Sequence, residues 1–250
     1  MKLKGNRVLV TGAGTGMGLE AAKQLTALGN EVLMVARNED RLREEAARLA
    51  NATVFACDLS DPAQIDALVA HVRANVPGLN WVFLNAGVTH TYKLFGTEDT
   101  IGHAAREMAT NYLSAVRILT LLEPVLAQQA DPAFILTTSG TALVPDISNP
   151  TYSATKAALH SLAQSARLTL ERKGSAIKVF EILAPLVDSP FAKDVQSEHK
   201  LPPADVIRDV LADLGKDVYQ IHPGPAVNLY RQFLESPEKA LHLINQMTNA

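Results

Sequence analysis

The sequence has one cysteine, little excess charge and no long apolar run, and each shortage excludes a class of protein. Cys57 alone cannot form an internal disulfide, so we expect a reducing, cytoplasmic setting. No apolar run reaches the roughly 18 residues that span a bilayer, and Thr11-Gly12 interrupt the first run too early for a signal peptide. A net charge of −3 gives no reason to expect nucleic acid or a membrane as partner. The seven histidines lack ligand spacing, so we expect no metal site.

Strand-like and helix-like segments alternate along the 250 residues. The expected strands are 7–11, 31–36, 53–57, 81–84, 133–138, 177–183 and 217–221, and the expected helices include 39–50, 101–129 (broken or bent near Pro124), 151–172 and 204–214. This order predicts an α/β protein with a Rossmann-type doubly wound parallel sheet of about seven strands and helices on both faces, a three-layer α/β/α sandwich. No linker divides the chain, so we expect one domain over residues 1–250, with a substrate lid around 187–203.

A glycine-rich turn, Thr11–Gly18, lies between the first expected strand and a helix-forming segment. Such a turn lets a phosphate approach the backbone and the free N–H groups of the helix N-terminus. The glycines have the spacing Gly-x-x-x-Gly-x-Gly, and Gly14 also supplies a shorter Gly-x-Gly spacing. The alternative is a tight packing turn without a ligand. We expect dinucleotide binding here, by Gly12, Gly14, Thr15, Gly16, Met17 and Gly18.

The end of the second expected strand indicates which dinucleotide binds. NAD sites usually carry an acidic residue there for the ribose 2′-hydroxyl, whereas this chain has Ala36 followed by Arg37 and Asn38. A guanidinium can bind a 2′-phosphate, so we expect NADP (as NADPH) rather than NAD. The alternative is that Arg37 belongs to a solvated loop. Further cofactor contacts are expected from the ends of the next two strands, at Asp58, Leu59, Asn85, Ala86 and Gly87.

Ser139 to Lys156 is the expected catalytic segment. If the chain is helical from Thr151, then Tyr152 and Lys156 lie on one face as an i, i+4 pair. A neighbouring ammonium favours phenolate, so the pKa of Tyr152 is expected below its reference of about 10. The phenol then serves as a general acid/base. The alternative is a surface Tyr-x-x-x-Lys pair without function. Asn111 interrupts the helical segment before it, and from the residues alone an exposed, neutral asparagine is favoured there.

Together these motifs resemble the single-domain short-chain dehydrogenases/reductases. The resemblance implies that Tyr152 is the acid/base, that Lys156 lowers its pKa and binds the nicotinamide ribose, that Ser139 holds the substrate oxygen, and that Asn111 anchors a water beside Lys156. Nicotinamide contacts are implied for Pro185, Val187 and Ser189, although the family's Pro-Gly pair is replaced here by Ala184-Pro185. The Pro-Leu-Val-Asp-Ser stretch also resembles a bacterial branch found with teichoic-acid D-alanylation genes.

The expected function is NADP(H)-dependent hydride transfer between nicotinamide and a small-molecule carbonyl or alcohol substrate. Candidate substrate contacts are His90, Thr141, Leu143 and Phe191. One alternative is an NADP-binding regulatory or scaffold protein without turnover. Apolar helix faces around 104–129 and 151–172 also lead us to expect a homodimer or homotetramer.

Overall fold

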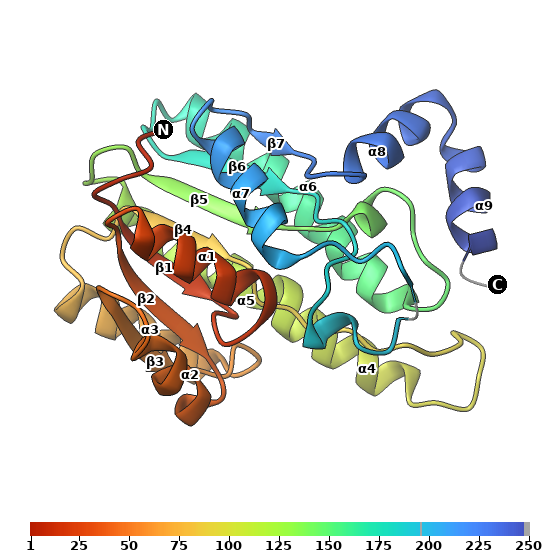
Figure 1. Cartoon of the computed structure of the whole chain (residues 1–250), viewed down its shortest axis with the longest axis horizontal. Coiled ribbons are helices and arrows are strands. Elements are labelled where there is room, and N and C mark those ends of the chain that lie inside the picture. Colours follow the sequence, from red (N-terminus) through yellow and green to blue (C-terminus); the bar gives the residue numbers. More distant parts are fainter. Residues whose placement is uncertain (196, 248–250) are drawn as a thin grey trace.

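Seven parallel strands form one sheet in the computed structural model, which describes residues 1–195 and 197–247 (Figure 1). The strand order is β3-β2-β1-β4-β5-β6-β7. The strands are β1 Arg7–Thr11, β2 Glu31–Ala36, β3 Ala52–Ala56, β4 Trp81–Leu84, β5 Ala133–Thr137, β6 Lys178–Ile182 and β7 Gln220–Ile221. The order reverses between β1 and β4, where open α/β sheets bind their ligands at the carboxyl ends. The predicted doubly wound sheet is therefore confirmed.

Two layers of helices cover the sheet because the side chains of each strand point alternately to its two faces. Val8 and Val10 pack on one face and Leu9 on the other. The first face carries α1 Gly16–Ala27, α2 Glu39–Ala46 and α7 Pro203–Leu214; the second carries α3 Pro62–Asn75, α5 Ser114–Leu126 and α6 Pro150–Arg172. Nearly every strand residue of β1, β4 and β5 is buried, as expected for a sheet covered on both sides.

Three predictions differ from the structure by more than a residue. The helical segment 101–129 is not broken at Pro124, because α5 continues through that residue to Leu126. The irregular turn comes earlier, where the π-helix η1 Met108–Leu113 separates α4 Thr100–Glu107 from α5. Helix α2 ends at Ala46 rather than at residue 50. Strand β7 has two residues rather than five, because Asp217 has a left-handed backbone with φ of 57° and cannot begin an extended strand.

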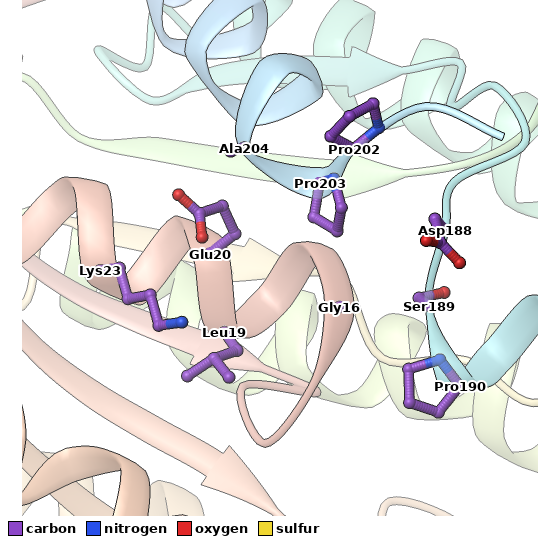
Figure 2. Close-up of a pocket in the computed structure, with 10 residues that line it drawn as sticks. All are labelled: Gly16, Leu19, Glu20, Lys23, Asp188, Ser189, Pro190, Pro202, Pro203 and Ala204. Carbon is purple, nitrogen blue, oxygen red and sulfur yellow. The ribbon is translucent and has the colours of Figure 1, made fainter.

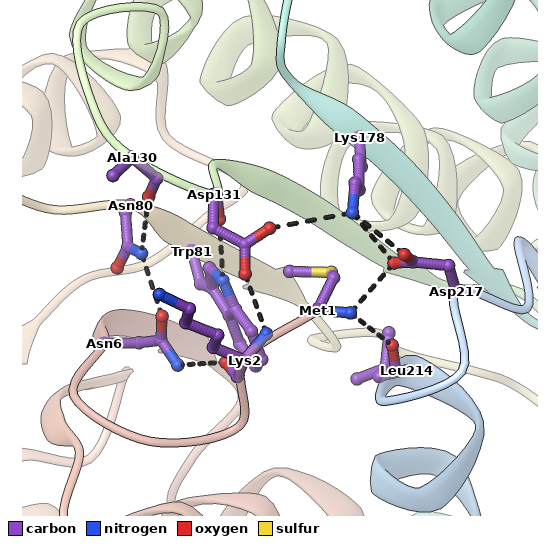
Figure 3. Close-up of polar contacts among 10 residues, drawn as sticks. All are labelled: Met1, Lys2, Asn6, Asn80, Trp81, Ala130, Asp131, Lys178, Leu214 and Asp217. Atoms are coloured by element: carbon purple, nitrogen blue, oxygen red, sulfur yellow. Dashed lines mark hydrogen bonds and ion pairs between the residues drawn. The ribbon is translucent and has the colours of Figure 1, made fainter.

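Polar groups connect the segments at the amino ends of the strands, opposite the carboxyl ends (Figure 3). The Met1 ammonium donates to Asp217 Oδ1 at 3.0 Å, and Lys178 Nζ donates to the same oxygen at 2.9 Å. Lys178 Nζ also lies 3.6 Å from Asp131 Oδ1, whose partner oxygen Oδ2 accepts from Lys2 N at 2.8 Å. The segments before β1, β5 and β7 and the first residue of β6 are thereby held together.

The carboxyl ends of the strands point to the side where α4, α8 Ala226–Glu235 and α9 Pro237–Met247 gather, at the right of Figure 1. The loops that follow β1, β4, β5 and β6 meet there. Within the described ranges, no helix has both the length and the apolar composition needed to cross a membrane.

Candidate active site

The glycine turn after β1 is too tight for side chains at Gly12 and Gly18. Gly12 has a left-handed backbone with φ of 68°, and a Cβ there would lie 2.9 Å from Ala86 Cα. A Cβ on Gly18 would lie 2.3 Å from the Gly12 carbonyl oxygen. At Gly14, by contrast, a Cβ would meet only Ala36 Cβ at 3.6 Å, an ordinary contact. The positions without room for a side chain therefore belong to the Gly-x-x-x-Gly-x-Gly spacing. At Gly14 the protein itself leaves room for a methyl group.

Thr11 joins the ends of β1 and β4 at the reversal point of the sheet. Its hydroxyl accepts from the backbone N–H groups of Asn85 at 2.9 Å and Ala86 at 3.1 Å. The Asn85 side chain donates to the Thr11 carbonyl at 3.3 Å. These contacts hold Asn85–Gly87 beside the glycine turn, so the two predicted cofactor segments lie side by side.

Two of the predicted catalytic residues, Asn111 and Lys156, lie beside Gly87. A Cβ built on Gly87 would lie 3.4 Å from Asn111 Oδ1, 3.7 Å from Lys156 Nζ and 3.8 Å from the Phe191 ring. Helix α6 presents Tyr152 and Lys156 one turn apart, and Lys156 Nζ lies 5.6 Å from the centre of the Tyr152 ring. Both side chains are buried, at 8% and 3% exposed. Residues from α6, η1 and the loop after β4 thus surround one small space.

The predicted direction of the Tyr152 pKa was wrong. Burial raises the pKa of this phenol, a hydrogen bond with Ser139 partly offsets the rise, and the charge of Glu107 adds to it. The expectation considered only the lysine, but the cost of burying a phenolate is larger. Burial also lowers the pKa of Lys156 to about 8, and its ammonium donates to the Thr137 carbonyl at 2.7 Å rather than to the phenol. Tyr152 is therefore held as the protonated phenol.

Asn111 is buried, at 2% exposed, so the exposed asparagine favoured from the residues alone was wrong. Its Oδ1 accepts from Val88 N at 2.8 Å, and its Nδ2 donates to Val88 O at 2.9 Å and to Thr155 Oγ1 at 3.0 Å. The wide turn of η1 lets this side chain face inward. Asn111 ties η1 to the loop after β4 and to α6.

The residues assigned to the adenosine end are close together, but several have structural roles of their own. Asn38 caps α2 by accepting from Arg41 N at 3.0 Å. Asp58 accepts from Ser60 N at 2.9 Å and Ser60 Oγ at 2.8 Å. Burial raises the Asp58 pKa, but these bonds and the charge of Arg37 outweigh it, so the net pKa is below the usual value. Leu59 is in the core, leaving its backbone for any ligand contact.

The loop after β6 approaches the glycine turn, as Figure 2 shows. A Cβ on Gly16 would lie 3.0 Å from Ser189 Cβ, and a pocket of about 230 Å³ lies between this pair and Pro202–Ala204. Val187 is buried and bridges to Leu201, which closes the base of the segment expected as a lid. Pro185 precedes this bridge. Residue 196 of the segment lies outside the described residues.

The four candidate substrate residues have different environments. Phe191 is 43% exposed and its ring centre lies 5.6 Å from that of Tyr152. Thr141 follows Ser139 in a 3₁₀ turn, and its buried Oγ1 has no partner among the described residues. Leu143 is half-buried after the same turn. His90 Nδ1 lies 2.9 Å from Glu107 Oε1.

Glu107 was not predicted from the sequence. It is the last residue of α4 and is fully buried. Its carboxylate accepts from His90 N at 2.8 Å, from the His90 ring at 2.9 Å, and from Thr151 Oγ1 at 2.6 Å. Thr151 accepts in turn from Tyr92 OH at 2.6 Å. One feature of the sequence could have indicated it: Glu107 precedes Asn111 by four residues, so in a helix the two side chains lie on the same face.

These residues fit a dinucleotide. The glycine turn has no room for side chains, it opens onto the N-terminus of α1, and β4 delivers Asn85–Gly87 beside it. No cluster of three or more His, Cys, Asp or Glu side chains able to hold a metal ion occurs in the part of the chain that the structure describes. Fold and site together are those of a dinucleotide-binding protein with a Rossmann sheet.

Comparison with known proteins gives the family. Residues 6–200 match the profile of the family described as short chain dehydrogenase, and the chain belongs to that family. A relative named uncharacterized oxidoreductase DltE, from Bacillus subtilis, is 36% identical over 76% of this chain and 74% of its own length. This match confirms the resemblance to the branch found with teichoic-acid D-alanylation genes. A fatty acyl-CoA reductase from Acinetobacter baylyi is 32% identical over 75% of this chain and 64% of its own length.

Solved structures share the fold. A short chain dehydrogenase from Burkholderia cenocepacia, in complex with NADP, has a TM-score of 0.85 at 22% identity, covering 97% of this chain and 98% of that one. A family member from Burkholderia phymatum, in complex with NAD, has a TM-score of 0.84 at 20% identity, covering 94% of this chain and 96% of that one. The seven-stranded architecture is therefore the family's.

Proposed function

We propose that this protein is an NADP(H)-dependent oxidoreductase that interconverts a carbonyl compound and its alcohol, with Tyr152 as general acid/base. The observation that carries the proposal is the position of Lys156 and Asn111 beside Gly87, at the reversal point of the sheet, with Tyr152 next to Lys156 on the same face of α6. Burial keeps the phenol protonated, which is the form needed to donate a proton during reduction.

The glycine turn and Asn85–Gly87 would hold the nicotinamide cofactor, which would supply a hydride for the carbonyl carbon. Tyr152 gives its phenolic proton to the substrate oxygen, and Ser139 donates a hydrogen bond to that oxygen as negative charge develops on it. Lys156, fixed by the Thr137 carbonyl, places an ammonium near the phenolate that remains. Asn111 keeps Gly87–Val88 in place against α6. In the oxidative direction each proton transfer is reversed.

Substituting Tyr152 by Phe tests the acid/base assignment. We expect turnover to fall at least about a hundredfold, the lower end of general acid–base contributions, while cofactor binding persists. Tyr219→Phe is the matched control, because that phenol belongs to the segment before β7 and stacks on Phe180. Wild-type turnover in Tyr152→Phe would remove the assignment. Cofactor binding without turnover of any carbonyl by the wild type would instead favour the silent regulatory alternative.

The NADP preference is proposed from Arg37, an exposed cation at the carboxyl end of β2 with no ion pair among the described residues. Arg37→Ala should raise the KM for NADPH about tenfold or more and leave that for NADH nearly unchanged, because only NADPH carries the 2′-phosphate. Arg41→Ala, on the next helix, is the control. Equal effects of Arg37→Ala on both cofactors would refute the preference.

Substrate, lid and assembly complete the proposal. The substrate is a small carbonyl or alcohol compound, and the relative named fatty acyl-CoA reductase supports including acyl thioesters in the first panel of substrates to be assayed.

The segment 187–203 acts as a lid of a single domain, because Phe191 packs on Tyr152 while the Val187–Leu201 bridge holds the base of the segment. We expect a cytoplasmic homodimer or homotetramer; sedimentation of the purified chain tests the assembly, and a monomer would refute it.

A further inference from the structure

Three basic side chains line one cavity beside the active site. Arg37, Arg106 and Lys193 surround a space of about 320 Å³ that also reaches Gly87 and Phe191, and Asp194 is the one carboxylate in its lining. None of the three cations forms an ion pair with a carboxylate among the described residues, although the charge of Arg37 lowers the pKa of Asp58. Because the whole chain carries a net charge of −3, this local excess of positive charge runs against the overall charge.

Arg106 is held in position by a stack of two imidazoles. Its Nη2 donates to His103 Nδ1 at 3.0 Å, and the His103 ring stacks on His90 with 4.2 Å between ring centres. His90 is fixed in turn by Glu107 at 2.9 Å. The remaining guanidinium donors of Arg106 have no partner among the described residues. A guanidinium fixed in this way loses less rotamer freedom when it binds an anion.

The Glu107 carboxylate does not pair with Arg106 among the described residues, although its negative charge lies behind His90 and reduces the local excess of positive charge. It is fully buried and accepts from His90 N, the His90 ring and Thr151 Oγ1. Its role is to orient His90 from behind. A second polar atom also lacks a partner: the buried hydroxyl of Thr89, a residue that lines the same cavity, makes no hydrogen bond among the described residues. The donors that the cavity wall offers to a ligand are therefore those of Arg106 and Lys193, because the Thr89 hydroxyl is itself buried.

The two ends of the cavity are lined by different parts of the fold. Arg37 and Ser60 lie with the adenosine-side segments after β2 and β3, while His90, Arg106 and Thr110 come from the loop after β4, α4 and η1. Val88, Pro190 and Phe191 contribute apolar surface to the same lining. An extended substrate with its carbonyl at Tyr152 and an anionic group at the α4 end matches this distribution.

We propose that Arg106 and Lys193 form a subsite for an anionic group of the substrate, so that the protein acts on carbonyl compounds carrying a carboxylate or phosphate. This inference rests on the proposed oxidoreductase function and specifies its substrate class. Charge-assisted hydrogen bonds to an oxyanion are about twice as strong as neutral ones. Partial exposure of the cavity and the presence of Asp194 reduce the gain.

Matched substrates test the proposal with the full-length protein and NADPH. A series of oxo-carboxylic acids of increasing chain length is compared with the corresponding methyl esters, and phosphorylated hydroxyketones with their unphosphorylated forms; the two arms distinguish carboxylate from phosphate. We expect kcat/KM to be about tenfold higher for at least one anionic member than for its neutral partner, the scale of one charge-assisted bond. Added salt should reduce this preference.

Two variants locate the subsite. Arg106→Gln and Lys193→Gln should each raise the KM for the anionic substrate several-fold to about tenfold, without changing the KM for its neutral partner or for NADPH. Arg106→Lys should recover part of the loss, and Arg172→Gln, at the far end of α6, is the control. Melting curves check that the variants are folded.

The possible failures are distinguishable. If neutral partners react as well as anions, or if Arg106→Gln affects both members of a pair equally, the anion subsite is wrong while the oxidoreductase function stands. A raised KM for NADPH in Arg106→Gln would assign this arginine to the cofactor instead. If no carbonyl compound in either arm consumes NADPH, both the proposed function and the subsite fail.

Discussion

Replacing Gly18 by Ala should destabilise the protein through a single methyl group. The new Cβ would lie 2.3 Å from the Gly12 carbonyl oxygen, 2.7 Å from Gly12 C and 2.7 Å from Asn85 Nδ2. Two of these atoms are backbone, so they cannot rotate away, and we take the cost at the upper end for overpacking, about 3 kcal/mol. Alanine's better helix propensity returns about 1 kcal/mol. The net loss is about 2 kcal/mol, or a Tm decrease of roughly 4–8 °C for a chain of this size.

Differential scanning fluorimetry of Gly18→Ala beside Gly14→Ala measures this difference. Gly14 is the matched control because its Cβ would meet only Ala36 Cβ at 3.6 Å and its backbone is not left-handed. We expect Gly14→Ala to melt within about 1–2 °C of the wild type, as for a substitution within about 0.5 kcal/mol. Equal melting temperatures for the two variants would refute the close packing of Gly18 on Gly12.

Three further predictions concern titrating groups. Because burial lowers the pKa of Lys156 to about 8, turnover should fall above pH 8 as the ammonium is lost, and residual activity of Lys156→Arg should lack that fall. A hydrogen bond with Glu181 raises the pKa of His160 above 6.5 although burial opposes it, so its stabilisation is complete below pH 6.5 and is lost as pH rises through the folded-state value; His160→Gln should therefore lower the Tm most at acid pH. Burial, with the charges of Asp58 and Asp61, raises the pKa of Cys57 to about 11, so a thiol reagent should react with it only after unfolding.

The sheet could be predicted from the sequence because its strands are short apolar runs that end at glycine, asparagine or serine. Thr11 and Leu84 mark such ends, and both strands were located to the residue. What could not be predicted were irregular backbones set by tertiary contacts. The left-handed Asp217 shortens β7, and η1 forms where Asn111 bonds to Val88 and Thr155, partners far along the sequence.

The arrangement of the proposed catalytic pair was predictable because spacing alone places Tyr152 and Lys156 on one face of α6. Their electrostatics were not, because burial outweighs the neighbouring charge and is invisible in a motif. Glu107 was missed for a related reason: a charged residue in a helical segment is usually exposed, and only the three donors gathered around it stabilise its burial.

The extra residue in the π-turn sets the phase between two helices. Each residue advances an α-helix by about 100°, so shortening η1 by one residue would rotate α4 about its axis by roughly that angle relative to α5. Glu107 would swing away from His90, and Arg106 would leave the cavity, while α5 and the sheet stayed in place. The length of this one turn thus determines which face of α4 lines the active site. Homologues that differ there by one residue would present other side chains to their substrates.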